Sequence, residues 1–107
     1  MKAIKIQYAD KTTWALPLNF GQLEEFEPLL KEIGKESTEL AQGNVTEMPM
    51  GTLRKQIQII KAAIRRYDPT FNREKDFTIQ EINTAFVAII SGSGLEEVPE
   101  GETKPGA

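Results

Sequence analysis

The stretch TLRKQIQIIKAAIRRY, residues 52–67, has the clearest helical pattern in the chain. Its apolar side chains recur every three or four residues, the spacing that places them on one side of a helix: Leu53, Ile57, Ile60, Ile64 and Tyr67. Asp68 and Pro69 follow, and because a proline disfavours helical geometry in the residue before it, the helix is expected to end there. We expect the other elements to pack around the apolar side of this helix.

Near the start of the chain, residues 3–18 alternate between apolar and polar side chains, a pattern typical of two short strands. A turn is expected at residues 9–11, where alanine, aspartate and lysine interrupt the alternation. The apolar face of this hairpin is expected to carry four side chains: Ile4, Ile6, Trp14 and Leu16. Because two strands alone are marginally stable in water, that face is expected to pack on the helices.

The stretch PLNFGQLEEFEPLL, which follows the hairpin, indicates another helix. Asn19 and Gln22 form a capping-box pattern, in which each side chain can accept a hydrogen bond from the other residue's backbone N–H. Gly34 is placed to end this helix, which gives bounds of about 20–33. Pro28 lies inside these bounds and lacks the N–H that an interior helical residue donates. We therefore expect the helix either to kink at Pro28 or to restart with Pro28 as its first residue, so that two short helical pieces meet at an angle.

A second capping-box pattern, formed by Thr78 and Glu81, indicates the start of the last helix. The helix is expected over residues 79–91, to end at Gly92, and to follow a polar connection over residues 70–76. Its apolar side carries five residues: Ile79, Ile82, Phe86, Ile89 and Ile90.

These patterns predict a mainly α fold with a small N-terminal β-hairpin, an α+β protein built as a compact bundle of three to four short helices. A length of 107 residues favours a single domain, which is expected over residues 1–94. Residues 35–50 lack a sustained period and are expected to form a linker or a frayed short helix. Residues 95–107 are acidic and poor in apolar side chains, so a disordered tail is expected.

Composition argues against several classes of function. The chain has no cysteine and no histidine, so thiol chemistry and the commonest zinc ligands are missing. No apolar run approaches the roughly 20 residues that cross a bilayer, and the first residues lack the apolar core of a signal peptide. The formal charge of −3 disfavours nonspecific binding of nucleic acid by the whole chain. We expect a cytoplasmic protein that is not an enzyme, with no catalytic residues, no metal site and no cofactor.

Two groups of residues could still carry chemistry. The first is four carboxylates that could share a proton or hold a cation: Glu24, Glu25, Glu27 and Glu32. They lie mostly off the apolar side of their helix, so a solvated surface is the preferred interpretation. The second is the SGSG segment, residues 91–94, whose serines have no histidine to act as a base. A flexible helix exit is the simpler interpretation of that segment.

The central helix carries five cationic side chains and no acidic one: Arg54, Lys55, Lys61, Arg65 and Arg66. At helical spacing these side chains lie away from the apolar residues, so the helix is apolar on one side and basic on the other. Three interpretations stay open, namely a solvated face, an acidic partner segment, or this chain's own glutamate-rich helix or tail. Nucleic acid is disfavoured because no aromatic residues alternate with these cations.

Three segments resemble the small tail assembly chaperones of long-tailed bacteriophages in their order along the chain and in their residue sequence. They are the hairpin leading into LPLNFGQLEEFEPLL, a central helix ending IIKAAIRRYDP, and the closing FTIQEINTAFVAIISGSGL. The resemblance covers roughly residues 4–95. It implies a mainly helical protein without enzymatic activity that binds the tape-measure protein, keeps it soluble and helps recruit tail-tube subunits. It also implies a place in the cytoplasm of the bacterial host and absence from the mature virion.

If the resemblance holds, the protein acts by noncovalent binding and not by catalysis. Apolar grooves then cover the apolar side of a client helix, and charged side chains set the orientation of that helix. Six apolar residues are then the candidates for partner contact: Leu23, Phe26, Leu30, Ile57, Ile60 and Phe86. The charged candidates are four cations: Arg54, Lys61, Arg65 and Arg66. The possibility that the chain forms a homo-oligomer stays open. The alternative function is a small non-enzymatic adaptor or structural module of a virion or of a host regulatory complex.

Overall fold

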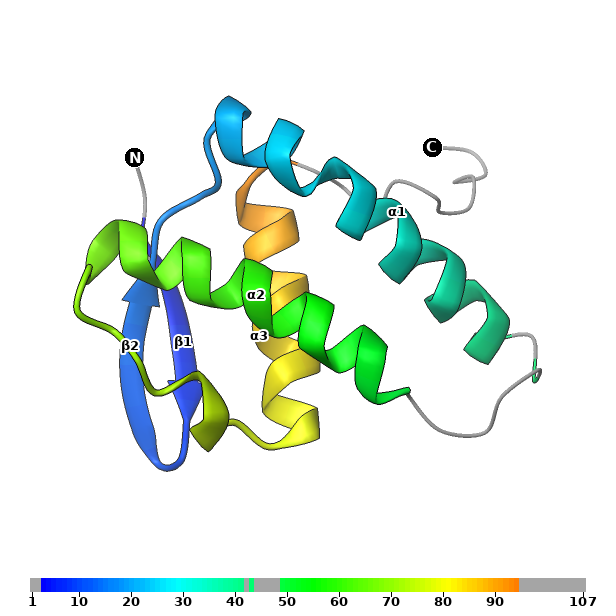
Figure 1. Cartoon of the computed structure of the whole chain (residues 1–107). Helices are drawn as coiled ribbons and strands as arrows, with labels where there is room; N and C mark the ends of the chain where they lie inside the picture. The colour runs from blue at the N-terminus through cyan, green and yellow to red at the C-terminus, as the bar shows by residue number, and fades with distance from the viewer. Residues whose placement is uncertain (1–2, 42, 44–48, 95–107) are drawn as a thin grey trace.

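The computed structural model describes residues 3–41, 43 and 49–94 (Figure 1). An N-terminal hairpin is followed by helices, which confirms the predicted α+β fold. The elements in chain order are β1 (Ile4–Tyr8), β2 (Lys11–Ala15), α1 (Phe20–Ala41), α2 (Met50–Tyr67), the short 3₁₀ helix η1 (Glu74–Asp76) and α3 (Ile79–Gly92). The tail expected at 95–107 lies outside the described residues, as do residues 42 and 44–48 of the expected linker.

Helix α2 is the centre of the fold and begins two residues before the predicted start. It contacts β2, α1, η1 and α3, and it crosses in front of α3 in the view of Figure 1. Seven of its residues are buried: Thr52, Leu53, Gln56, Ile59, Ile60, Ala63 and Ile64. One hydrophobic core joins this helix to the hairpin, α1 and α3, so the described residues pack as one body.

The hairpin is present, but its register differs from the prediction. Ile6 pairs with Thr13, and Lys5 pairs with Trp14. Cross-strand partners lie on the same face of a sheet, so Trp14 shares a face with Lys5 and not with Ile6. Trp14 is 37% exposed, whereas Ala15 is fully buried. The expectation that Trp14 belongs to the buried face is therefore wrong.

The turn explains this difference of register. Ala9 and Asp10 both have positive φ, 47° and 62°, and Tyr8 pairs directly with Lys11. This is the two-residue hairpin turn whose twist suits the flanking strands. The prediction of a turn over residues 9–11 is one residue too long, and a slip of one residue moves every following side chain of β2 to the other face.

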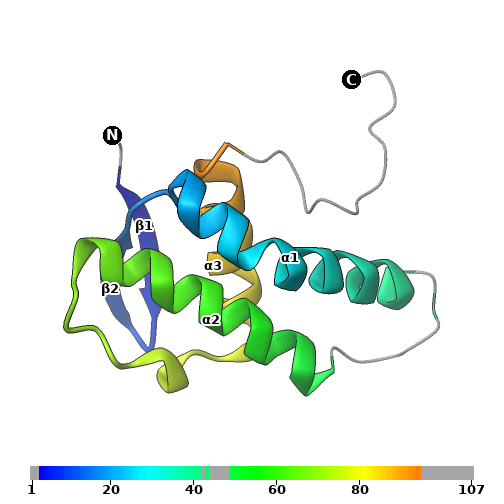
Figure 2. The ribbon, with the colours of Figure 1, turned by 45° about the horizontal axis from the view of Figure 1, so that its top comes forward.

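Helix α1 is one helix of 22 residues with Pro28 inside it, so the expectation of a restart at Pro28 is wrong and the alternative of a kinked helix remains. The predicted capping box is confirmed, since the Gln22 N–H donates to Asn19 Oδ1 at 2.8 Å and the Asn19 N–H donates to Gln22 Oε1 at 3.2 Å. Pro28 is exposed, and water can reach the carbonyl that loses its helical partner. Figure 2 shows the axis of α1 changing direction after its first turns.

The end of α1 also differs from the prediction. Gly34 is buried inside the helix, which continues to Ala41. A glycine inside a helix costs only about 1 kcal/mol relative to alanine, which packing can offset. The expected linker is therefore partly helical: residues 35–41 belong to α1, and Met50 already belongs to α2.

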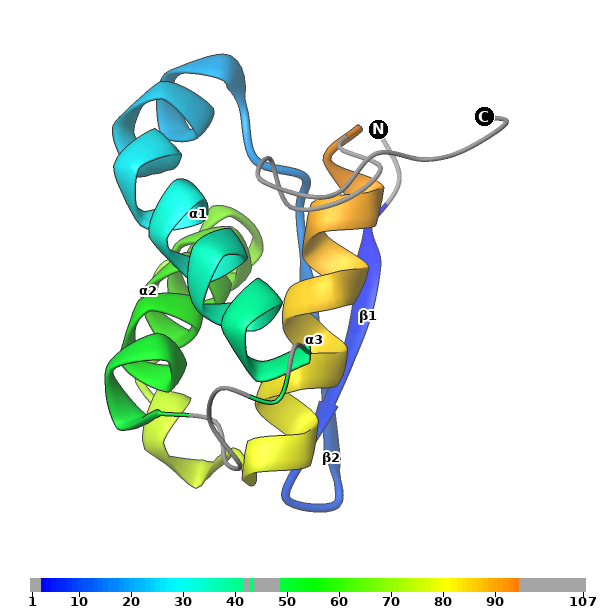
Figure 3. The same cartoon turned by 90° about the vertical axis from the view of Figure 1, so that its right-hand side faces the viewer.

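Helix α3 has the predicted capping box and ends at the predicted residue. The Glu81 N–H donates to Thr78 Oγ1 at 3.1 Å, and the Thr78 N–H donates to Glu81 Oε1 at 2.9 Å. Figure 3 shows α3 alongside β1, with α1 and α2 on the other side of α3. The end of α3 is close to the start of β1, because a Cβ added to Gly92 would lie 2.6 Å from Ile4 Cδ1.

The connection between α2 and α3 is less polar than predicted. Phe71 and Phe77 are buried, and both contact Tyr8 at the end of β1. The Tyr8 ring stacks on Phe77 with a centroid distance of 4.7 Å and meets Phe71 edge-on at 5.9 Å. These aromatic contacts hold the connection against the hairpin.

Candidate functional site

The basic side of α2 is largely occupied by groups of the same chain. Lys55 Nζ lies 2.9 Å from Glu32 Oε1 and 2.8 Å from Glu36 Oε2, both on α1. The Thr52 hydroxyl also donates to the Glu36 carboxylate. These contacts hold the second half of α1 on α2.

The local environment changes the acidity of this pair. Burial acts to raise the pKa of Glu36, but hydrogen bonds from Lys55 and Thr52 and the nearby positive charges outweigh it and lower that pKa. Hydrogen bonds to Glu36 and Glu32 raise the pKa of Lys55. Both groups are therefore held in their charged forms, and the charge of each stabilises the charged form of the other.

The other end of α2 is held in the same way. Lys61 Nζ forms an ion pair of 3.1 Å with Glu74 Oε2 of η1. Burial acts to raise the pKa of Glu74, but a backbone hydrogen bond and the contact with Lys61 lower it. Arg65 Nε donates to the Phe71 carbonyl at 2.8 Å, and the Arg66 guanidinium donates to the Pro17 carbonyl.

These contacts show which cations of the basic face are already bound within the chain. Four of its five cations contact this chain's own acidic groups or carbonyl oxygens, and Arg54 is exposed. The interpretation in which the chain's own glutamates meet the basic helix is correct for Lys55, whose partners lie on the glutamate-rich α1. Arg54 is free of ion pairs within the described part of the chain and stays a candidate for an acidic partner.

The six apolar candidates fall into two groups. Leu30, Ile60 and Phe86 lie in the core with at most 3% of their surface exposed, so partner contact at these positions would require the core to open. The other three are half-buried and pack against the core from outside: Leu23, Phe26 and Ile57. The apolar surface accessible to a partner is therefore smaller than the sequence predicts.

Phe26 of α1 meets the outer side of α2 in an open groove of about 330 Å³. The α2 residues that line it are Gln58, Lys61, Ala62 and Arg65. The structure thus brings three of the sequence-predicted candidates together, one aromatic ring and two cations. Leu23, Ile57, Arg54 and Arg66 lie outside this groove.

The chemistry of this groove, which we call the α1–α2 groove, suits an apolar side chain accompanied by a carboxylate. Ala62 and the Phe26 ring offer apolar surface. The charge of Lys61 is already balanced by Glu74. Within the described residues, the Arg65 guanidinium donates through Nε alone, to the Phe71 carbonyl, so the N–H groups of its two terminal nitrogens remain for an acceptor.

Sequence reasoning missed two residues of the groove, Gln58 and Ala62. Both lie on the polar side of α2, where neither a charge nor an apolar spacing distinguishes them. It also missed Glu74, which neutralises Lys61 from a connection that showed no periodic pattern.

The four glutamates considered for acid-base or metal chemistry do not converge. Glu27 pairs with Lys31 at 3.5 Å on the exposed side of α1, and Glu32 pairs with Lys55. Within the described ranges, no three acidic side chains lie close enough together to hold a metal ion. The Ser93 hydroxyl of the SGSG segment accepts a hydrogen bond from the Leu18 N–H at 2.9 Å. That serine therefore joins the end of α3 to the chain that leaves the hairpin.

No family model, curated protein or solved structure matches this chain. Among the residues that the structure describes, no helix combines the length and the apolar character needed to span a membrane. The candidate site therefore rests on the geometry of the α1–α2 groove.

Proposed function

We propose that this chain is a non-enzymatic binding protein that acts as a phage tail assembly chaperone in the cytoplasm of the bacterial host. In this role it binds the tape-measure protein, keeps it soluble, helps recruit tail-tube subunits and is absent from the mature virion. The proposal rests on the resemblance of residues 4–95 to that family. The observation that supports a binding role is the α1–α2 groove, which combines Phe26 with Arg65, a cation without an ion pair in the described part of the chain.

The groove favours an amphipathic helix as the bound segment. Helices bind in such grooves through apolar side chains spaced three or four residues apart. An apolar residue of the client would contact Phe26 and Ala62, and a carboxylate one turn away would reach Arg65. A long, largely apolar client gains solubility when its apolar stripe is covered in this way.

Co-expression tests the proposal directly. A phage tape-measure protein is produced in bacteria alone and together with this chain, and the soluble fraction is purified through a tag on this chain. The proposal predicts a soluble complex that depends on co-expression. A client that stays insoluble and does not co-purify would contradict it.

The adaptor or structural alternative makes a different prediction about the virion. A structural module stays in the finished particle, whereas a chaperone leaves it. Mass spectrometry of purified mature particles should therefore not detect this chain. Detection at a stoichiometry similar to that of tail proteins would replace the chaperone proposal with the structural one.

A further inference from the structure

The two edges of the hairpin differ in what the rest of the chain places beside them. On the β2 side, the N–H of Leu16, one residue past the end of β2, donates to the Ala63 carbonyl of α2 at 3.1 Å, so a helix is bonded to one end of that edge. On the β1 side there is no third strand, because the described sheet contains β1 and β2 alone. An open edge exposes backbone N–H and C=O groups that another strand can bind.

The register identifies the open backbone groups. Tyr8 pairs with Lys11 across the two-residue turn, so backbone groups along β1 alternate between facing β2 and facing away from it. The groups of Ile6 face β2, whereas those of Lys5 and Gln7 face the open edge. The next odd-numbered residue follows the same alternation, because the Ala9 N–H donates to the Glu81 carboxylate at 3.2 Å.

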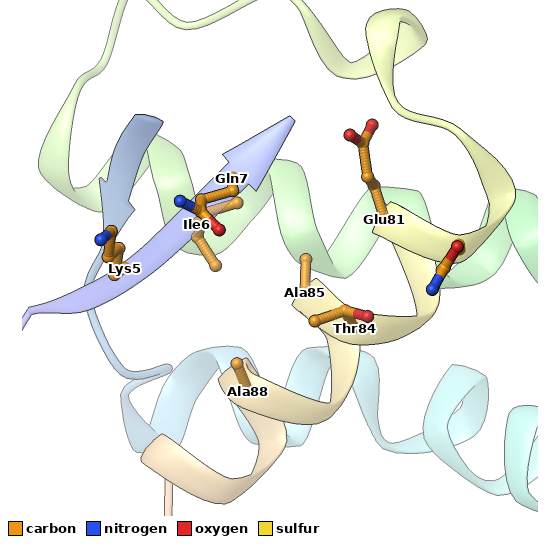
Figure 4. A pocket seen from close by; sticks show the side chains of 8 residues that line it. Lys5, Ile6, Gln7, Glu81, Thr84, Ala85 and Ala88 are labelled. Carbon is orange, nitrogen blue, oxygen red and sulfur yellow. The ribbon is translucent and has the colours of Figure 1, made fainter. Parts of the chain in front are cut away.

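Helix α3 borders this edge and leaves a groove of about 270 Å³ (Figure 4). Residues 5–7 of β1 form one side of the groove. Thr84, Ala85 and Ala88 of α3 form the other, and Figure 4 shows these small side chains on the side of α3 that faces β1. Small residues at these positions leave room beside the strand. At one end, Glu81 already binds the Ala9 N–H and limits the open stretch.

We propose that the open edge of β1 binds an extended peptide segment of a partner polypeptide as a third strand. The bonds are made by the N–H and C=O groups of Lys5 and Gln7, as in other cases of strand addition. A helical segment does not suit this edge, because its own backbone groups are already paired. This site is separate from the α1–α2 groove and does not depend on the identity of the client proposed above.

The groove also specifies the side chains of the bound strand. Alternate residues of a strand point to opposite faces, so one set faces Ala85 and Ala88 and the other set faces solvent beside Lys5. The first set is therefore small and apolar. The second set includes a carboxylate, because Lys5 is exposed and has no ion-pair partner in the described part of the chain. A second copy of this chain fits less well, since it would bring a whole hairpin into a groove that α3 narrows.

The probe is a capped seven-residue peptide in which valines alternate with glutamate and threonine. Amide hydrogen exchange is measured by NMR on the whole chain, free and with the peptide. In the free chain, the amides of Lys5 and Gln7 should exchange fast, and those of Ile6 and Tyr8 slowly, because only the latter face β2. At a peptide concentration ten times its Kd, exchange at Lys5 and Gln7 should slow about tenfold, with Ile6 and Tyr8 unchanged.

Two N-methylated peptides distinguish backbone hydrogen bonding from nonspecific binding of the peptide. Each carries N-methyl groups on one of the two alternating sets of backbone amides. Since only one set faces β1, one methylated peptide should lose binding and the other should keep it. Equal binding by both, or no protection of Lys5 and Gln7 by the parent peptide, would overturn the proposal.

Protein variants test the groove itself. Thr84→Lys places a long side chain in the groove and should abolish protection. Val87→Lys is the matched control, because Val87 is 65% exposed and does not line the groove. Slow exchange at Ile6 and Tyr8 in both variants shows that the hairpin is intact.

Two further results would overturn the proposal by identifying another occupant. In the first, the amides of Lys5 and Gln7 exchange slowly in the free chain and exchange fast once residues 95–107 are deleted. That result would assign the edge to this chain's own C-terminal segment. The second is protection that rises with protein concentration, together with a dimer in sedimentation, which would assign it to a second copy.

Discussion

Glu36 of α1 and Lys55 of α2 form an ion pair that joins the two helices, with Oε2 and Nζ 2.8 Å apart and both side chains less than a third exposed. The position of α1 decides where Phe26 lies, and Phe26 is one side of the α1–α2 groove. This ion pair is thus a structural support of the candidate binding site, although neither residue lines it.

Replacing Glu36 with glutamine should destabilise the chain by about 1–2 kcal/mol at neutral pH, because a charge-assisted hydrogen bond becomes a neutral one. The folded-state pKa of Glu36 is lowered, so its contribution is present above its unfolded pKa and is lost as pH falls through the folded pKa. The difference between wild type and Glu36→Gln, measured by urea unfolding, should therefore shrink in acid.

The same ion pair also predicts how the stability of the folded chain changes at high pH. The pKa of Lys55 is raised, so its contribution is present below its unfolded pKa and is lost as pH rises through the folded pKa. Glu27→Gln is the matched control, since Glu27 pairs with Lys31 where both side chains are more than half exposed. Its effect should stay within about 0.5 kcal/mol. A Glu36→Gln effect that is equally small, or independent of pH, would show that the pair does not hold α1.

Gln56 should be replaceable with a gain in stability. It is 4% exposed, and its Oε1 has no hydrogen-bond partner among the residues that the structure describes. A buried polar group without a partner destabilises the folded state, so Gln56→Met should raise the free energy of unfolding by about 1 kcal/mol. Gln58→Met, at an exposed position of the same helix, should change it little. A clear loss of stability in Gln56→Met would show that the amide makes a contact the protein needs.

The hairpin turn should accept a stabilising change. Ala9 and Asp10 both adopt positive φ, which costs alanine more than asparagine or glycine. The double variant Ala9→Asn, Asp10→Gly should therefore add about 1 kcal/mol of stability, measured as a rise in the midpoint of thermal unfolding. An unchanged or lower midpoint would argue against this two-residue turn and the register that follows from it.

Glu81 should matter more than an ordinary capping residue. Its carboxylate accepts from the Thr78 N–H at 2.9 Å and from the Ala9 N–H at 3.2 Å, so it joins the start of α3 to the hairpin turn. Thr78→Ala should cost about 1 kcal/mol through the lost cap. Glu81→Ala should cost more, about 2 kcal/mol, and should speed amide exchange at Ala9. Equal costs with unchanged exchange at Ala9 would mean that the second contact adds nothing.

Regular local patterns made much of the fold predictable. The end of α2, the bounds of α3 and both capping boxes follow from spacing and from side-chain chemistry close to the helix ends. The face of Trp14 did not follow, because it depends on a turn length that alanine and aspartate do not specify. The continuation of α1 through Pro28 and Gly34 depends on packing against α2, which local propensity does not include.

The candidate site was harder to predict than the fold. A cation such as Lys61 has the same sequence pattern whether it faces a partner or Glu74, and only the path of the connection decides between them. Phe26, Lys61 and Arg65 were identified as candidates, but their convergence in one groove depends on the crossing of α1 over α2. Leu30, Ile60 and Phe86 show the reverse case, since residues that form a core and residues that form a binding stripe have the same spacing.

The most direct test of the proposed function measures the affinity of a soluble tape-measure fragment, the proposed client, for variants of Phe26 and Arg65. Phe26→Ser and Arg65→Glu should each weaken binding on the order of tenfold or more, while Phe26→Leu and the distant Val87→Ser should bind nearly as wild type does. Circular dichroism of each variant checks that the fold is retained. Folded Phe26→Ser and Arg65→Glu proteins that bind with wild-type affinity would contradict the claim that the α1–α2 groove holds the client.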